Sequence, residues 1–303
     1  MKQGRSGFVA LVGKPNVGKS TLVNAMAGQK LAIVSPKPQT TRNRLRAIVN
    51  RPGAQLVLVD TPGLTEGGDA LRQTLRRITG SAAADADVGL AMLEIRGIKP
   101  ELDDMDRQVL AMAQRQGLVV VINKVDRLPD KAMLLPWMEV LHGATGGAVV
   151  IPVSARTGDG LEVLERELIS RLPEGPFLFP EDMVTDEAER AIVGELVREQ
   201  ILLQTHEEVP HAAAVVIESF EDGRGDDDGL CRIEGRIYIE RDSQKGILVG
   251  KKGSRIKSIS EAARHEIEAL LGARVYLRLT VHVSKDWRKN ERAVLKLGYG
   301  DNE

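Results

Sequence analysis

An apolar run that leads through a glycine-rich turn into a helix-forming stretch is the feature that most constrains this chain. Residues 8–12 read FVALV, residues 13–20 read GKPNVGKS, and residues 21–26 read TLVNAM. The two glycines let consecutive backbone N–H groups curl around phosphates, and the N-terminus of the following helix adds partial positive charge. The sequence therefore predicts a phosphate-binding loop rather than an ordinary strand-to-helix turn.

This loop assigns roles to individual residues. We expect Lys19 to reach the β and γ phosphates of a nucleotide, and Ser20 to ligate Mg²⁺. The other nucleotide contacts expected from the loop and the helix that follows it are Gly13, Asn16, Val17, Gly18 and Thr21.

Two later segments are expected to complete the phosphate site. Residues 28–42 are polar and interrupted by prolines, and so long a connection is typical of a nucleotide switch in which a threonine reaches Mg²⁺ and the γ-phosphate. Thr40 and Thr41 are both candidates. The apolar run 55–59 then ends in the sequence DTPG, in which Asp60 holds Mg²⁺ through a water and the Gly63 N–H senses the γ-phosphate. The predicted catalytic residues are Lys19, Thr40, Thr41 and Gly63, and the predicted metal ligands are Ser20, Thr40, Thr41 and Asp60.

A third segment indicates which base is bound. The apolar run 118–122 ends in Asn123, Lys124 and, two residues later, Asp126. A carboxylate accepts hydrogen bonds from N1–H and the 2-amino group of guanine, whereas adenine offers an acceptor at N1 and has no 2-amino group. After the apolar run 149–153, backbone groups can contact the guanine O6 in a segment made of Ser154, Ala155 and Arg156. The predicted ligand is a guanine nucleotide.

The order of the elements predicts the fold class. Expected strands at 8–12, 45–49, 55–59, 88–93, 118–122 and 149–153 alternate with expected helices at 103–116 and 161–172. The ligand motifs all follow strands, which is typical of an open, mostly parallel α/β sheet with its ligand at the carboxyl edge. Residues 172–180 are rich in proline and cannot continue a helix. We therefore expect a nucleotide-binding domain at 1–172, a linker at 173–182 and a second domain at 183–303.

The second domain has a different pattern. A helix is expected at 185–205, strands at 213–219, 230–240 and 275–283, and an exposed loop at 221–229. In the second strand, Cys231, Ile233, Ile237 and Ile239 alternate with polar residues and should face the core. Cys231 is the only cysteine, so it forms no internal disulfide, which suits a reducing compartment.

A glycine-bearing turn lies between the last two of these strands. Residues 246–249 are an apolar turn of helix, 250–253 read GKKG, and a second helix follows whose apolar stripe is Ile256, Ile259, Ala263, Ile267 and Leu270. Two helices joined by G-x-x-G are the device by which KH domains approach a nucleic-acid backbone. A solvated basic turn is the alternative. The predicted RNA-binding residues are Gly250, Lys251, Lys252, Gly253, Arg255 and Lys257.

Composition limits the partners. The formal net charge is −1, so RNA contact depends on a local basic patch, and residues 241–257 supply one with six Lys or Arg and a single acid. No apolar run approaches the length of a membrane span, and the first strand follows the N-terminus without a signal-peptide core. A cytoplasmic protein is expected.

Together these motifs resemble the Era family of bacterial GTPases. The resemblance is carried by GKPNVGKS, PKPQTTR, DTPG, NKVD, SAR, FPEDM, EEVPH and ERDSQKGILVGKKG, and it spans nearly the whole chain. It implies a P-loop GTPase domain followed by an α+β type II KH domain, GTP hydrolysis with Mg²⁺, and a monomer. It also implies binding of the KH domain to the 3′ end of small-subunit ribosomal RNA, a role in assembly of the 30S subunit, and loose association with the inner face of the cell membrane.

Two positions depart from what the resemblance implies. Residues 92–96 read MLEIR where an aliphatic strand ending in aspartate and alanine is expected. Leu64 stands where many GTPases place the glutamine that orients the attacking water, which predicts slow intrinsic hydrolysis helped by a cation, a bridging water or a partner. Related potassium-activated GTPases share the G-x-P-N-x-G-K-S pattern and use its asparagine to ligate K⁺, which makes Asn16 a candidate K⁺ ligand.

Three functions are compatible with these features. The leading interpretation is a GTP-hydrolysing switch. A second is a passive RNA-binding factor in which bound GTP is structural, and it differs from the first in that RNA leaves turnover unchanged. A third is a GTPase acting on transfer RNA modification or on membranes, but the sequence has neither a cysteine-rich modification motif nor an amphipathic anchor.

Overall fold

The chain forms two compact units. The computed structural model describes residues 3–65, 67–95, 97, 99–114, 117–225 and 228–300. The first unit comprises Met1–Val34, Thr41–Gly67 and Leu75–Asp186, and the second comprises Ser35–Thr40, Gly68–Thr74 and Glu187–Glu303. Two short segments from the first half of the sequence thus belong to the second unit.

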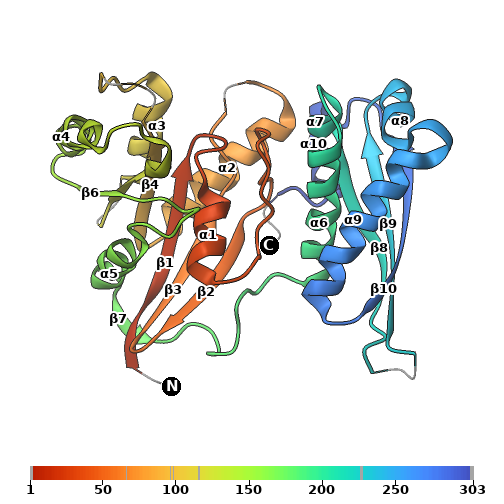
Figure 1. Ribbon diagram of the computed structural model, residues 1–303, viewed down its shortest axis with the longest axis horizontal. Helices are drawn as coiled ribbons and strands as arrows, with labels where there is room; N and C mark the ends of the chain where they lie inside the picture. The colour runs from red at the N-terminus through yellow and green to blue at the C-terminus, as the bar shows by residue number, and fades with distance from the viewer. Residues whose placement is uncertain are drawn as a thin grey trace. The chain divides into compact units, whose positions relative to one another are not determined.

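The first unit is built on one sheet (Figure 1). Its strand order is β2-β3-β1-β4-β5-β6, with β7 paired to β1, and only β2 and β7 run antiparallel to their neighbours. This confirms the expected open, mostly parallel sheet. The strands are β1 (Gln3–Gly13), β2 (Leu45–Arg51), β3 (Ala54–Asp60), β4 (Val88–Glu94), β5 (Val119–Asn123), β6 (Val149–Pro152) and β7 (Glu174–Pro176).

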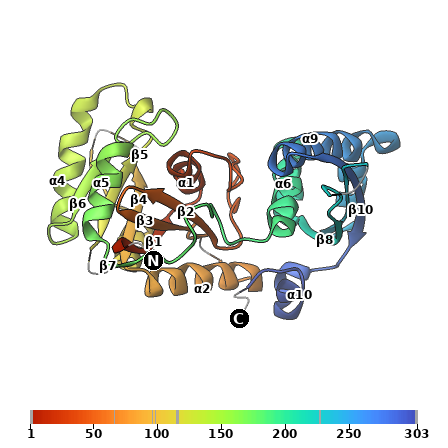
Figure 2. The same cartoon turned by 90° about the horizontal axis from the view of Figure 1, so that it is seen from below.

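Helices cover both faces of this sheet, and Figure 2 shows α1 and α2 on opposite sides of it. The helices are α1 (Lys19–Ala27), α2 (Ala70–Asp85), α3 (Asp104–Ala113), α4 (Leu134–Ala144) and α5 (Leu161–Arg171), with short 3₁₀ turns at Val125–Arg127 and Lys131–Met133. Val9 and Leu11 of β1 pack with α1 and α5, whereas Val12 packs with α3 and α4. Successive side chains of a strand point to opposite faces, so a strand buried on both faces is apolar throughout.

The C-terminal part of the first unit is attached to this sheet. Glu174–Pro176 form β7, so part of the segment expected to be a linker is a strand. The buried Gln55 accepts hydrogen bonds from the N–H groups of Leu178 and Phe179, at 2.8 and 2.9 Å. The Ile48 N–H donates to the Val184 carbonyl at 2.8 Å. The domain limits at 172 and 183 stay a prediction.

Apart from two short helices, the second unit has the order helix, strand, strand, helix, helix, strand that is expected of a type II KH domain. Its sheet has the order β10-β9-β8, with β8 antiparallel and β10 parallel to β9. Helices α6 and α9 lie side by side against it (Figure 1). The elements are α6 (Glu189–Gln204), α7 (Val209–Ala212), β8 (Ala214–Glu221), β9 (Leu230–Ile239), α8 (Asp242–Val249), a 3₁₀ turn at Lys251–Gly253, α9 (Ser254–Leu271), β10 (Arg274–Val283), a 3₁₀ turn at Trp287–Lys289 and α10 (Glu291–Lys296).

Most expected elements are present, with some corrections at their ends. Cys231 and the three isoleucines of β9 are fully buried, as the alternation predicts. Leu270 is wrong as the last residue of the α9 stripe, because Leu271, four residues after Ile267, is the buried one. Helix α6 begins at Glu189 and not near Thr185, since Thr185 bridges to Ala47 of β2.

Other expected ends fall partly outside the described residues. The expected helix 103–116 is present as α3, but Arg115 and Gln116 lie outside them. The same holds for Arg96 in the segment 92–96 and for Asp226 and Asp227 in the expected loop. Helices α2 and α4 were not expected from the sequence.

Candidate functional site

The loop between β1 and α1 has the backbone that phosphate binding needs. Gly18 caps α1 with φ of 105°, and Asn16 has φ of 62°, both in the left-handed region. A Cβ added at Gly18 would lie 2.3 Å from Nδ2 of Asn123, and one at Gly13 would lie 2.8 Å from the Met92 carbonyl oxygen. Both positions therefore require glycine, and the loop opens directly onto the N-terminus of α1.

Lys19 lies buried inside this loop. Its Nζ donates to the carbonyl oxygens of Gly13 and Lys14, at 3.1 and 3.3 Å. Burial lowers the pKa of Lys19 to about 8, although the charge of Asp60 opposes the shift. A phosphate bound in the loop would stabilise the ammonium form, so the buried lysine favours an anionic ligand.

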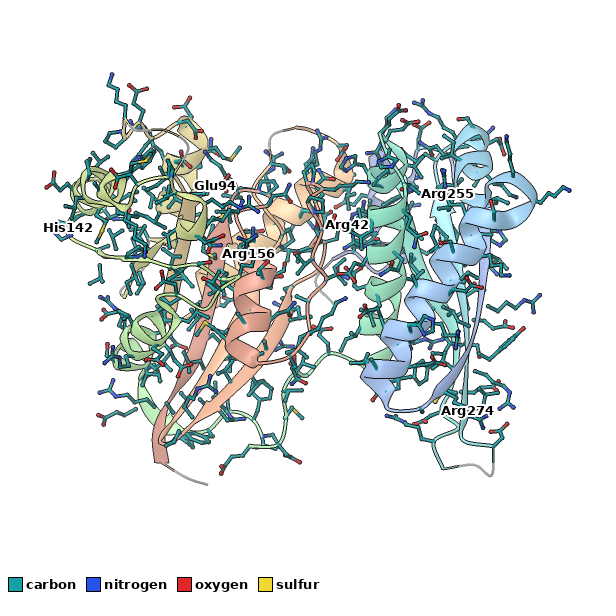
Figure 3. The ribbon with its side chains drawn as sticks, in the orientation of Figure 1. Arg42, Glu94, His142, Arg156, Arg255 and Arg274 are labelled. Carbon is teal, nitrogen blue, oxygen red and sulfur yellow. The ribbon has the colours of Figure 1, made fainter. Side chains whose placement is uncertain are left out.

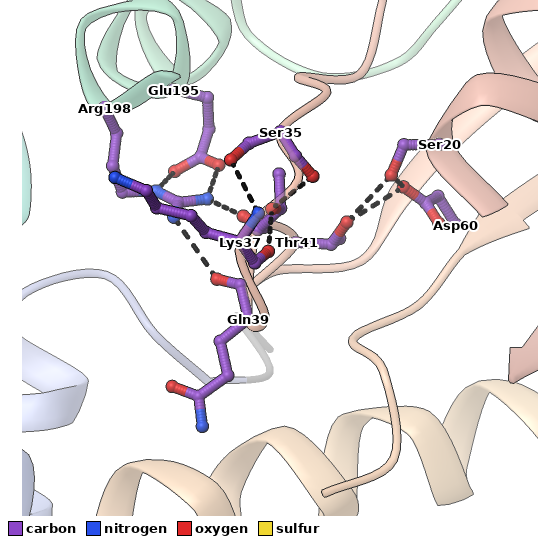
Figure 4. A network of polar contacts seen from close by, with 9 residues as sticks. Ser20, Ser35, Lys37, Gln39, Thr41, Asp60, Glu195 and Arg198 are labelled. Carbon is purple, nitrogen blue, oxygen red and sulfur yellow. Dashed lines mark hydrogen bonds and ion pairs between the residues drawn. The ribbon is translucent and has the colours of Figure 1, made fainter. Parts of the chain in front are cut away.

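Three oxygens converge beside Lys19 at the carboxyl edge of the sheet. Ser20 Oγ lies 2.7 Å from Oδ2 of Asp60 and 3.0 Å from Oγ1 of Thr41, and Thr41 Oγ1 lies 3.2 Å from the same Oδ2. Of the two candidate threonines, Thr41 joins this cluster, whereas the Thr40 hydroxyl donates to the Lys37 carbonyl at 2.7 Å. Figure 4 shows the three converging side chains.

The cluster fits a hard cation that is shared with phosphate. Asp60 is fully buried, its Oδ1 has no hydrogen-bond partner in the described part of the chain, and burial raises its pKa against the opposing charge of Lys19. Among described residues, no three His, Cys, Asp or Glu side chains form a metal-binding group. Mg²⁺ is usually held by one or two carboxylates, waters and substrate phosphates, and this donor set is of that kind.

The base motif joins the two loops on either side of it. Asn123 donates from Nδ2 to the Val17 carbonyl at 2.8 Å and accepts at Oδ1 from the Ala155 N–H at 3.0 Å. Asp126 accepts from Ser154 Oγ at 2.7 Å and from Arg156 at 2.5 Å. The Ser154 hydrogen bond, with the charge of Arg156, lowers the pKa of Asp126 and keeps it an ionised acceptor.

Two lysines of these motifs form ion pairs that the sequence did not predict. Lys124 has φ of 65°, and its ammonium pairs with Glu94 at the end of β4, inside the segment that departs from the family pattern. Figure 3 labels Glu94 and Arg156 on the first unit. The buried Lys14 lies 2.6 Å from both Asp103 and Asp106 at the start of α3. The capping-box acids at the start of α3 are a sequence signal for the helix, but not for this pairing.

The residues around the expected γ-phosphate sensor are closely packed. A Cβ added at Gly63 would lie 2.7 Å from the Pro15 nitrogen. The Leu64 N–H donates to the Gly13 carbonyl at 3.1 Å, and the Leu64 side chain is only 3% exposed, in the core cluster that includes Val12. A buried leucine has no group with which to orient water.

The turn between α8 and α9 presents a basic surface. Gly250 and Gly253 have φ of 73° and 79°, and a Cβ added at Gly250 would lie 2.8 Å from Cβ of Arg255. The four predicted basic side chains are exposed, and Figure 3 labels one of them, Arg255, whose Nη1 donates to the Ile247 carbonyl at 3.1 Å. Exposed cations around a glycine turn at a helix N-terminus can contact nucleic-acid phosphates. These four side chains are Lys251, Lys252, Arg255 and Lys257.

Among the helices of the described ranges, none is both long enough and apolar enough to cross a membrane.

Family models match both units. A model described as a 50S ribosome-binding GTPase matches residues 8–124, and a model described as a KH domain matches residues 208–288. The chain is 44% identical over 295 residues to GTPase Era of Geobacter metallireducens, covering 97% of this chain and 98% of the relative. It is 41% identical over 300 residues to GTPase Era of Syntrophus aciditrophicus, covering 98% and 96%.

Two solved structures of Era are similar to the whole chain. One is a variant of Era from Aquifex aeolicus bound to GDP and AlF4⁻, and the other is Era with MgGDPNP and nucleotides 1506–1542 of 16S ribosomal RNA. Each has a TM-score of 0.92 and 38% identity, and the match covers 98% of this chain and 100% of the other. Identity at this level over nearly full length shows that the chain belongs to the Era family of GTPases.

Proposed function

We propose that the chain is a GTP-dependent switch that binds the 3′ end of small-subunit ribosomal RNA through its KH domain and assists assembly of the 30S subunit. The observation that carries this proposal is the full-length likeness to the Era structure that holds MgGDPNP and 16S ribosomal RNA nucleotides. The exposed glycine turn between α8 and α9 supports the RNA part, and the loop after β1 supports the nucleotide part.

In this proposal the carboxyl edge of the first sheet binds Mg²⁺-GTP. Lys19 and the loop N–H groups bind the β and γ phosphates, and Asp126 accepts from the guanine N1–H and 2-amino group. Arg156, which now donates to Asp126, is 68% exposed and is free to leave when the base arrives. Ser20 and Thr41 would ligate Mg²⁺ directly and Asp60 through water, and the ion would neutralise charge on the phosphate oxygens.

Hydrolysis transfers the γ-phosphoryl group to water. The bond between the γ-phosphorus and the bridging oxygen breaks, the water oxygen bonds to phosphorus, and the water's proton leaves with the phosphate product. Lys19 and the Gly63 N–H stabilise negative charge on the phosphate oxygens, but Leu64 positions no water. We therefore expect slow intrinsic turnover.

A potassium ion is proposed to assist this step, because Asn16 lies in the loop at the position that such GTPases use. The measurement is the GTPase rate in K⁺ and in Na⁺ at constant ionic strength. A higher rate in K⁺ is expected. Equal rates would mean that Asn16 does not ligate K⁺ and only helps to form the loop.

Crosslinking to cellular RNA tests the RNA part of the proposal. The purified protein, with a non-hydrolysable GTP analogue, is crosslinked in a lysate and the bound segments are mapped. We expect enrichment of the 3′ end of small-subunit ribosomal RNA and co-sedimentation with 30S particles. Enrichment of transfer RNA would contradict the proposal, and so would a result in which no RNA is enriched. Fractionation of cells tests the expected cytoplasmic location with loose contact at the inner face of the membrane, and size-exclusion chromatography tests the expected monomer.

The buried Leu64 also favours a second candidate, a passive RNA-binding factor whose bound GTP is structural. The two candidates differ in whether RNA changes turnover. Acceleration of GTP hydrolysis by the 16S segment supports the switch, and an unchanged rate supports the passive factor.

A further inference from the structure

The guanidinium of Arg198 is fully buried and contacts a segment far away in the sequence. Arg198 lies on α6 and donates through Nε to Oε1 of Glu195 at 2.8 Å. Its Nη1 donates to the Gln39 carbonyl at 3.5 Å, and its Nη2 donates to the Thr40 carbonyl. Figure 4 shows Arg198 in contact with Glu195 and Gln39. All of these residues belong to the second unit, because Ser35–Thr40 is part of it.

A buried charge is costly unless it is paired and hydrogen-bonded. Burial works against the charged form of Arg198, but the Glu195 carboxylate, together with Tyr299 and Glu199, outweighs burial and raises the pKa of Arg198. Glu195 thus stabilises the cation, and the cation in turn holds two consecutive backbone carbonyls. Gln39 has φ of 62°, a left-handed conformation that a non-glycine residue adopts only when its surroundings hold it there.

A second contact holds the other part of the same segment. The Lys37 ammonium donates to the Thr205 carbonyl at the C-terminus of α6. The segment Ser35–Thr40 is therefore held at two places along one helix, by Arg198 in its middle and by the carbonyl at its end. The helix supplies one of the two cations, Arg198, and the segment supplies the other, Lys37.

The carbonyl that Arg198 holds sets the direction of the Thr41 N–H group. The Thr40 C=O and the Thr41 N–H belong to one planar peptide group, so a hydrogen bond that orients the carbonyl also orients the N–H. Thr41 is the threonine whose hydroxyl lies with Ser20 and Asp60. A conformational change that turns this peptide group must therefore break or rebuild the hydrogen bond to Arg198.

We propose that Arg198, stabilised by Glu195, is a positioning residue that holds the Thr40–Thr41 peptide group in the conformation that binds the triphosphate. The inference rests on the proposed GTP-dependent switch. It names Arg198 of α6 as the residue of the KH-bearing unit that responds to the nucleotide state. Arg198 touches neither nucleotide nor RNA in this account, and it acts through Thr41.

The test compares two nucleotides in the full-length chain. Affinities for a fluorescent non-hydrolysable GTP analogue and for GDP are measured with Mg²⁺, for wild type, Arg198→Gln, Arg198→Lys and Glu195→Gln. Arg198→Gln should weaken the analogue about 10-fold and change GDP less than 2-fold, because a charge-assisted hydrogen bond is lost in the triphosphate state only. Arg198→Lys should be intermediate, because it keeps the charge but not the paired donors.

Arg190→Lys is the control on the same helix. The exposed Arg190 donates to the Ile217 carbonyl at 2.9 Å and to the Glu218 carbonyl, both on β8 and away from the segment. The Arg190→Lys variant should leave the ratio of the affinities for the GTP analogue and for GDP unchanged. Circular dichroism checks that each variant folds. If Arg198→Gln does not fold, Glu195→Gln replaces it, because the Glu195 side chain is partly exposed and its substitution should disturb the core less.

The ratio of the two affinities decides the inference. If folded Arg198→Gln, or Glu195→Gln in its place, binds both nucleotides with the wild-type ratio, Arg198 does not position Thr41 and the inference is wrong. An equal loss for both nucleotides would also contradict it, since a merely structural role acts on both states. RNA is absent from this assay, so failure of the proposed RNA partner would appear only in the separate crosslinking experiment.

Discussion

Two glycine turns in this molecule both lead into a helix N-terminus, and they are built in opposite ways. The loop at 13–20 is enclosed, with Lys19 buried, Gly18 against Asn123 and Gly63 against Pro15. The turn at 250–253 is open, and its lysines are exposed and form no ion pair in the described part of the chain. An enclosed loop selects its ligand by fixed geometry, whereas an open basic turn binds by charge and tolerates variation in the bound backbone.

The largest expected effect tests the fixed geometry of the enclosed site. Asp126→Asn should weaken GTP about 100-fold or more and shift preference to xanthosine triphosphate, because the amide can donate to the O2 carbonyl of xanthine. Competition binding with both nucleotides measures it. An unchanged preference would contradict the guanine assignment.

The next effect tests the open turn. Lys251→Asp combined with Lys252→Asp should weaken RNA about 30-fold and reduce the slope of log affinity against log salt by roughly 1.4, because about 0.7 is lost per phosphate contact with a single strand. GTP affinity should stay at the wild-type value. Filter binding at several salt concentrations gives both quantities, and RNA affinity that survives at physiological salt would reject the turn as the RNA site.

A smaller effect follows from the buried Lys19. Its pKa is about 8 in the free protein, and bound phosphates should raise it, so nucleotide binding above pH 8 takes up a proton. GTP affinity should therefore fall about 4-fold between pH 7 and pH 8.5, where most free Lys19 is neutral. Calorimetry at pH 8.5 in two buffers of different ionisation enthalpy should detect the uptake, and binding without proton uptake would contradict the lowered pKa.

The smallest effect concerns the ion pair behind the base motif. Glu94→Gln should weaken GTP and GDP equally, by about 3-fold, because Lys124 loses a partly exposed partner. Glu165→Gln is the control, since Glu165 pairs with Arg51 at 2.8 Å elsewhere in the first unit. A selective loss of GTP, or the same loss in both variants, would show that Glu94 does not act through the base motif.

The local patterns were predictable because they follow from neighbouring residues. The loop at 13–20, the strands around it and the alternation in β9 each depend on spacing within a short window, and the structure contains them as expected. The last residue of the α9 stripe was wrong by one position, since Leu270 and Leu271 lie three and four residues after Ile267 and both spacings fit one helix face.

The long-range pairs were not predictable from one sequence. Lys14 pairs with Asp103, Lys124 with Glu94, and Arg198 holds the Thr40 carbonyl 158 residues away. The spacing of residues along the sequence does not predict such partners. The sequence also could not predict which threonine lies with Ser20 and Asp60. That depends on the long-range contacts that hold residues 35–40, because Thr40 and Thr41 are neighbours of the same residue type.

In the proposed switch, the nucleotide bound in the enclosed loop controls the affinity of the open turn for RNA. The measurement is affinity for the 16S 3′ segment with a non-hydrolysable GTP analogue and with GDP, alongside the affinities of both nucleotides with and without RNA. We expect tighter RNA binding with the analogue, by about 5- to 150-fold, and an equal factor by which RNA favours the analogue over GDP, because linkage is reciprocal. Equal RNA affinity in the two nucleotide states would contradict the claim and leave a GTPase and a KH domain that act independently.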